Sequence, residues 1–186
     1  SGNGHDAVLQ NIGLAPGRSG NALRCTGRGM AVVPDSRQLD LPEEVTICLW
    51  FKLKGSTGTW QSLVTKFLGN QSRNYGIYLC PDATGPGFST SFENADYPHT
   101  DCTAKTPLLD GAWHHLAVSV SALDQNVVLY VDGELAVKRA VALGLLKTND
   151  EPILIGQGVR GLIDDVRIYG WALPQATIRD VMGGSE

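Results

Sequence analysis

The chain has 186 residues, of which 42% are hydrophobic and 18% charged, enough for one substantial core but short for two full domains. Its formal net charge of -4, its pI near 5.5 and its lack of a basic run argue against binding to nucleic acid or an anionic membrane. No apolar stretch approaches the roughly 20 residues that span a bilayer, so membrane insertion is not expected.

Residues 1–186 are therefore expected to form a single domain. The sequence opens on SGNGHDA, a loop-like phrase without the charged and apolar regions of a signal peptide. We expect this domain to be excised from a larger protein.

Short runs of β-branched and aromatic residues, separated by Gly, Pro, Asn and Asp, recur along the chain. This pattern is typical of a sandwich or barrel of antiparallel strands. The clearest runs are residues 29–34, 45–53, 61–67, 75–80, 87–93, 114–121, 127–131, 135–140 and 153–156. Asp132 and Gly133 supply the positive-φ dipeptide of a tight hairpin.

A further strand is predicted in GLIDDVRIYGWAL, residues 161–173. Strict alternation places Leu162, Asp164, Val166 and Ile168 on one face, so Asp164 is expected to point with the apolar residues, and Asp165 outward. A carboxylate on a core-facing row must be neutralised, hydrogen-bonded or bound to a cation, because burying it bare is costly.

One short helix is predicted after this strand. Pro174 suits a first helical position, and Gly183 with Gly184 ends the helical pattern. The longest irregular stretch is residues 94–110, which is a candidate binding rim because long loops in compact domains are often functional.

The four cysteines lack the CxxC spacing of zinc and redox sites. Cys80 closes a predicted strand and Cys102 lies in the polar stretch after it, so we predict a disulfide between them. Cys25 and Cys48 lie in apolar strands, where a bridge and two buried thiols remain equal alternatives.

Five phrases occur in a familiar order and spacing: GNALRCTGRGMAVVPDS, VTICLWFK, DGAWHHLAVSV, VVLYVDG and GLIDDVRIYGWALPQATI. Over nearly its whole length the chain resembles laminin-G-like domains of the concanavalin A-like lectin and glucanase superfamily. The resemblance implies an all-β fold, a two-sheet antiparallel jelly-roll sandwich, here with one short C-terminal helix. Such domains are usually accessory modules that bind carbohydrate or protein, and many hold a structural calcium near the strand that matches GLIDDVRIY. The opening phrase resembles the end of the family's first motif, whose preceding strand and acidic residue are not in this sequence.

A structural calcium is therefore predicted beside Asp164. Calcium prefers carboxylate and carbonyl oxygens, and candidate ligands besides Asp164 are Asn3, Asp6 and a carbonyl of the glycine turn at Gly20. The alternative is that Asp164 accepts backbone N–H bonds or pairs with an arginine, without a metal.

A carbohydrate site needs an aromatic face for a sugar ring and polar groups for its hydroxyls. The candidates near predicted loops and strand ends are Trp60, Arg73, Asn74, Tyr78, Glu93, Asp96, Tyr97 and His99. The alternative for each aromatic residue is simple packing in the sandwich.

Catalytic patterns are missing from the sequence. The glucanase pattern ExDxxE does not occur, and on the predicted strand Asp164 and Asp165 point to opposite faces, whereas glycoside hydrolysis needs two carboxyls flanking one bond. Tyr97, His99 and Arg73 supply the residue types of a polysaccharide lyase without its neighbouring signatures.

We thus expect a non-catalytic carbohydrate-binding module of a secreted multidomain protein, located outside the cell or on its surface, with a polysaccharide or glycan as its partner. A protein-interaction or adhesion module is the alternative, with a protein partner. A glycan-cleaving enzyme is a weaker one.

Overall fold

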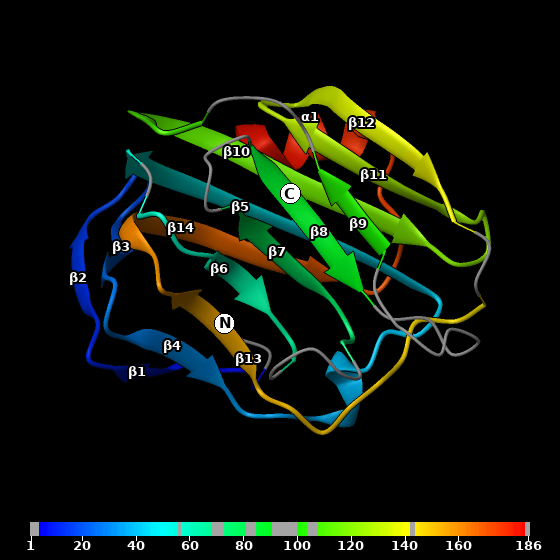
Figure 1. Cartoon of the computed structure of the whole chain (residues 1–186), viewed down its shortest axis with the longest axis horizontal. Helices are drawn as coiled ribbons and strands as arrows, with labels where there is room; N and C mark the ends of the chain where they lie inside the picture. Colours follow the sequence, from blue (N-terminus) through cyan, green and yellow to red (C-terminus); the bar gives the residue numbers. More distant parts are fainter. Residues whose placement is uncertain are drawn as a thin grey trace.

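Fourteen strands form two antiparallel sheets that pack face to face (Figure 1). The computed structural model describes residues 4–55, 57–67, 73–80, 85–90, 100–103, 108–141 and 144–184, with the backbone alone at residues 87–90 and 100–103. This architecture confirms the predicted jelly-roll sandwich. In the described part of the chain, no helix is long and apolar enough to cross a membrane.

Sheet A has the strand order β1-β4-β13-β6-β7-β8-β9. Its strands are β1 (Val8–Gln10), β4 (Met30–Val33), β13 (Ile153–Gln157), β6 (Gln61–Thr65), β7 (Gly76–Leu79), β8 (Pro86–Thr90) and β9 (Thr100–Thr103). Strand β9 lies within the stretch 94–110 that was predicted as a loop. Its sequence TDCT carries no apolar alternation, so no periodic signal marks it as a strand.

Sheet B has the strand order β12-β11-β10-β5-β14-β3-β2. Its strands are β12 (Glu134–Ala140), β11 (Asn126–Val131), β10 (Asp110–Ser121), β5 (Glu44–Lys54), β14 (Arg160–Tyr169), β3 (Asn21–Thr26) and β2 (Gly13–Pro16). The predicted hairpin at Asp132 and Gly133 is confirmed, because both residues have positive φ and join β11 to β12.

The core lies between the inner faces of the two sheets. Alternate residues of β5 and β10, such as Ile47, Phe51, Leu116 and Val118, are fully buried there, as period-2 alternation predicts. They meet side chains of sheet A, such as Ile77, in one continuous apolar cluster. A single 3-10 turn, η1 (Arg37–Leu39), follows β4 and contributes Leu39 to the same core.

One helix, α1 (Gln175–Gly183), covers the outer face of sheet B (Figure 1). Its Ile178 and Val181 pack on Cys48 and Tyr130 in a second apolar cluster. Pro174 precedes the helix as its N-cap instead of being its first residue, and Gly184 ends it with the left-handed C-cap that glycine favours.

Strand β14 contains a bulge that corrects its predicted faces. Asp164 pairs with Trp50 and Arg167 with Cys48, so three steps on β14 match two on β5, and Asp165 takes a φ of 48°. Asp164 therefore lies on the outer face of sheet B, and does not point between the sheets with the apolar residues. The bulge breaks strict alternation after Asp164 and returns the next apolar side chains to the core.

Candidate functional site

Asp164 is buried on the outer face because the turn between β2 and β3 folds over it. Its Oδ2 accepts hydrogen bonds from the backbone N–H groups of Arg18 at 2.7 Å and Ser19 at 3.2 Å, and its Oδ1 accepts one from Asp165 N–H at 2.9 Å. A Cβ at Gly17 would collide with Oδ2 of Asp164, so glycine is required at that position. The carboxylate thus ties the last strand to the first hairpin.

The predicted calcium ligands are brought together only in part. Asn3 lies outside the described residues, Asp6 is exposed, and the Gly20 carbonyl accepts the Gly17 N–H at 3.0 Å within the turn. Among the described side chains, no group of three or more His, Cys, Asp or Glu is arranged to hold a metal ion. The described residues fit calcium poorly, because the Asp164 oxygens already accept three N–H groups, and the calcium site stays a prediction.

A different cation lies inside the sandwich. The side chain of Lys66 is fully buried, and its ammonium contacts Asp35 at 2.7 Å and Asp40 at 3.2 Å. It also donates to the carbonyls of Asn149 at 2.6 Å and Glu151 at 3.2 Å. This charge is fully compensated by oxygen partners, and no sequence pattern that we considered pointed to it.

Two predicted ligand residues, Trp60 and Tyr78, meet on the outer side of sheet A. Their ring centroids lie 5.0 Å apart at an interplanar angle of 76°. Trp60 is 59% exposed whereas Tyr78 is 6% exposed, so the buried ring supports the exposed one from the side. Trp60 thereby offers an aromatic surface to solvent.

Two polar residues that sequence reasoning missed lie beside this pair. Ser62 pairs with Tyr78 on one side and with Gln157 on the other, so these three residues form one cross-strand row with Cβ atoms about 5 Å apart. Gln157 is exposed and Ser62 is half-buried. The alternation of ILIGQ could have marked Gln157 as outward, but the pairing of β13 with β6 is not visible in sequence. We call Trp60, Ser62, Tyr78 and Gln157 the Trp60 face.

The position of Trp60 is fixed by the strand ends around it. The turn that joins β13 to β14 passes next to its carbonyl, because a Cβ at Gly158 would come within 3.1 Å of that oxygen. The following residue, Gln61, is buried, and its Oε1 accepts a hydrogen bond from Arg160 N–H at 3.4 Å. The exposed ring therefore stands on a fixed backbone, which lowers the entropy cost of binding.

The other predicted ligand residues have different outcomes. Asn74 is fully buried, and its Nδ2 donates to the Lys147 carbonyl at 2.8 Å, so it supports the fold and is not a surface ligand. The Arg73 guanidinium lies 4.6 Å from the ring centroid of Phe67. Glu93, Asp96, Tyr97 and His99 lie outside the described residues.

The strand register argues against the predicted disulfide. Strand β8 lies between β7 and β9, and Cys102 is level with Ile77 across Phe88, three residues before Cys80. Two strands separated by a third are about 9.5 Å apart, whereas a disulfide needs Cα atoms within about 7 Å. The prediction of a Cys80–Cys102 bridge is therefore wrong for this register.

Cys25 and Cys48 are buried free thiols, which decides between the two alternatives left open by the sequence. Burial raises the pKa of Cys25 to about 11. It raises the pKa of Cys48 to about 12. Both side chains act as small apolar core residues.

Sheet B carries a second aromatic group on its outer face, next to Asp164. The Arg18 guanidinium lies 3.8 Å from the ring centroid of Trp50, and the Trp50 and His115 rings meet edge to face at 5.2 Å. Trp50 is 9% exposed and His115 1%. Burial lowers the pKa of His115 to about 4, so the ring is neutral at pH 7. This group is closed to solvent and offers no platform to a ligand.

The family assignment rests on the whole chain. The sequence model of Laminin_G_3, described as the concanavalin A-like lectin/glucanases superfamily, matches residues 26–179. The chain belongs to this family. No curated protein matches the sequence of this Laminin_G_3 domain significantly.

Solved structures share the Laminin_G_3 fold at low sequence identity. Domain 4 of AbnA, a GH43 extracellular arabinanase from Geobacillus stearothermophilus in complex with arabinotriose, is 22% identical with a TM-score of 0.75, over 97% of this chain and 89% of that one. The binding domain of Paraclostridial Mosquitocidal Protein 1 is 14% identical with a TM-score of 0.82, over 98% and 48%. The binding domain of Botulinum neurotoxin DC in complex with rat synaptotagmin II is 15% identical with a TM-score of 0.70, over 97% and 47%. The chain spans about half the length of the two toxin structures, and these likenesses establish the fold.

Proposed function

We propose that this chain is a non-catalytic carbohydrate-binding module of a secreted multidomain protein, and that a glycan binds on the Trp60 face. The observation that carries the proposal is the exposed Trp60 ring held against buried Tyr78. A flat aromatic surface matches the apolar side of a pyranose or furanose ring. Ser62 and Gln157 next to it provide a hydroxyl and an amide for sugar hydroxyls. The similar fold of a domain that holds arabinotriose supports the same ligand class.

The acidic residues of β14 support a non-catalytic role. Asp164 is engaged by three backbone N–H groups, and Asp165 forms an ion pair with Arg167 at 2.8 Å. General acid–base hydrolysis of a glycoside needs two carboxyls free to reach one bond. Neither carboxylate has that freedom.

Affinity electrophoresis in gels that each contain one soluble polysaccharide, arabinan included, tests the proposal. We expect at least one gel to retard the native chain, and Trp60→Ala to weaken that binding at least about tenfold. Trp171→Ala is the matched control, because Trp171 is 56% exposed but follows β14 of the other sheet. Retardation that Trp60→Ala leaves intact and Trp171→Ala removes would refute the Trp60 face as the site. No retardation in any gel would count against a glycan ligand.

A protein ligand is the second candidate, favoured by exposed apolar residues on two edge strands. Val8 and Leu9 of β1 are 58% and 43% exposed, and Leu14 of β2 is 54% exposed. Apolar side chains grouped on a surface are typical of protein interfaces. Capture of a protein partner that survives deglycosylation and is lost in Leu14→Lys would favour this function.

A further inference from the structure

Strand β14 is paired along only part of one edge. It pairs with β5 from Gly161 to Tyr169, but with β3 only from Arg160 to Ile163. Within the described residues, no strand pairs with the β3-side edge of β14 beyond Ile163. Because ladder hydrogen bonds of an antiparallel strand alternate between its two sides, some backbone groups of the second half of β14 face this open edge. Such an edge is a template for another strand.

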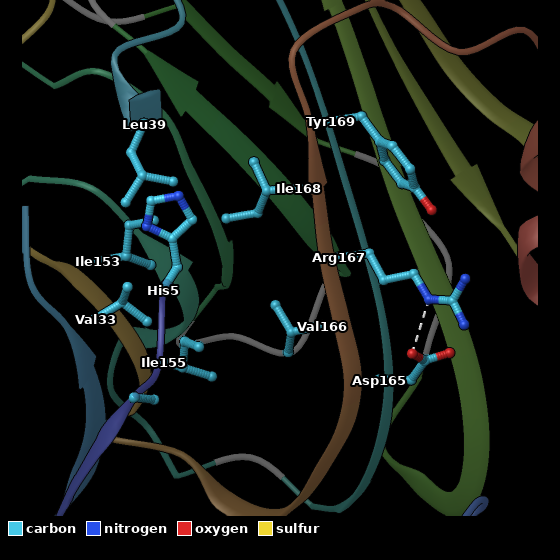
Figure 2. A pocket seen from close by; sticks show the side chains of 11 residues that line it. His5, Val33, Leu39, Ile153, Ile155, Asp165, Val166, Arg167, Ile168 and Tyr169 are labelled. Carbon is cyan, nitrogen blue, oxygen red and sulfur yellow. Dashed lines mark hydrogen bonds and ion pairs between the residues drawn. The ribbon is translucent and has the colours of Figure 1, made fainter. Parts of the chain in front are cut away.

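A cavity of 580 Å³ lies against this open edge. Five consecutive residues of β14, 165–169, line it, so the backbone as well as alternate side chains faces the cavity. Figure 2 shows Val166 and Ile168 pointing into it, and Asp165 and Arg167 pointing away. This volume is far larger than the voids that packed protein interiors tolerate.

The opposite wall belongs to sheet A and η1. It is formed by apolar side chains only, namely Val33, Leu39, Ile153 and Ile155. The cavity thus lies between the two sheets, where the inward side chains of a sandwich strand would normally pack. An occupant that fills it must bring apolar groups in from the side of β14.

His5 enters the cavity from the start of the chain. Its ring lies near Leu39 and Ile153 in Figure 2, and its Nε2 is 3.0 Å from Gln38 Oε1. An imidazole is a poor filler for an apolar wall, because its second ring nitrogen gains no polar partner from aliphatic side chains. The polypeptide on the N-terminal side of His5 therefore starts within reach of the open edge.

We propose that this groove binds one extended β-strand, supplied by polypeptide joined to the N-terminal side of the chain. The strand pairs with residues 165–169 of β14 and inserts alternate apolar side chains into the cavity, with His5 displaced toward its mouth. An extended strand satisfies both features at once, since its backbone completes the ladder and its side chains reach the cavity with period 2. A helix or a small apolar ligand would leave the ladder edge unpaired.

The test adds a strand before Ser1. One variant carries an extension of about eight residues, a usual strand length, in which threonine and valine alternate. Its matched control has the same composition with a proline at the centre, which cannot complete a ladder. We expect the alternating extension to slow amide exchange in residues 166–169 at least about tenfold and to raise the melting temperature. The same result for both extensions, or for neither, would overturn the proposal.

A second variant keeps the test informative if the extension fails to dock for reasons of sequence. Ile168→Asp places a charge in the cavity, and we expect it to cancel the gain from the alternating extension. The mass in solution is measured in parallel by light scattering. A dimer of the unextended chain, with residues 166–169 already protected, would assign the groove to a second copy and overturn the proposal.

Discussion

The ammonium of Lys66 lies 2.7 Å from Oδ1 of Asp35, and the lysine side chain has no exposed surface. Asp40 and the carbonyls of Asn149 and Glu151 complete its surroundings. One buried charge therefore connects the segment after β4, the end of β6 and the segment before β13. Removing the cation would leave two carboxylates without compensation in a largely buried place.

Lys66→Met is therefore expected to lower the free energy of unfolding by about 3 to 5 kcal/mol, because breaking a buried ion pair is costly. Urea denaturation followed by tryptophan fluorescence measures the change. Lys138→Met is the control, since Lys138 is exposed on β12 and should change stability by less than about 0.5 kcal/mol. Equal effects of the two substitutions would contradict the assigned role of Lys66.

Replacing Asp164 should open the turn between β2 and β3. Asp164→Ala removes the acceptor of the Arg18 and Ser19 N–H groups, and we expect a loss of about 2 to 4 kcal/mol. Asp165→Asn is the matched control, because the Asp165–Arg167 pair is partly exposed and worth about 1 kcal/mol or less. Amide exchange at Arg18 and Ser19 should become faster in Asp164→Ala alone. Unchanged exchange there would mean that other contacts hold the turn.

The buried His115 predicts acid sensitivity. Its pKa falls from 6.5 to about 4 on folding, chiefly because burial disfavours the imidazolium. Between these values the unfolded chain binds more protons than the folded one, so stability falls as the pH is lowered. The contribution amounts to about 3 kcal/mol. His115→Gln should flatten the dependence of unfolding free energy on pH between 4 and 6.5. An unchanged slope would show that His115 does not titrate in this way.

The neighbouring His114 should act with the opposite sign. Burial lowers its pKa, but hydrogen bonds to Asp132 and Asp110 outweigh burial and raise the pKa above the usual 6.5. Its contribution is then full below the unfolded-state pKa and is lost as the pH rises through the raised folded-state pKa. Thermal unfolding of His114→Gln should show a loss of stability relative to the native chain that is larger at pH 5 than at pH 9. A loss independent of pH would contradict the raised pKa.

Cys25 and Cys48 should resist alkylation in the folded protein. Both thiols are buried, and their raised pKa values leave almost no thiolate at pH 8. Iodoacetamide treatment followed by mass spectrometry should modify neither cysteine until a denaturant is added. Rapid modification of either one in the native state would show that its part of the sheet opens.

Much of the fold follows from local patterns. The alternation in β10 and the Asp132–Gly133 turn are confirmed because each depends on neighbouring residues only. The faces of β14 were wrong because a bulge inserts one residue, and nothing in IDDV announces it. The Cys80–Cys102 pair was wrong because β8 intervenes, which is a matter of strand order.

The candidate site was only partly predictable. An exposed aromatic residue can be guessed at a strand start, as for Trp60, but its neighbours come from other strands. Ser62 and Gln157 join it through the pairing of β6 with β13, strands separated by most of the chain. Asn74 looked like a loop ligand, yet its amide is consumed by the Lys147 carbonyl.

The bulge at Asp165 also has a consequence for how the chain can vary. Without Asp165, simple alternation from Ile163 would place Val166 and Ile168 inward and Arg167 outward, which is the arrangement that the strand already has. Asp165 is thus a single-residue insertion whose left-handed backbone restores the phase of β14. Deleting it should preserve the faces of the strand, whereas deleting any one of the residues 166–168 should turn the end of the strand inside out.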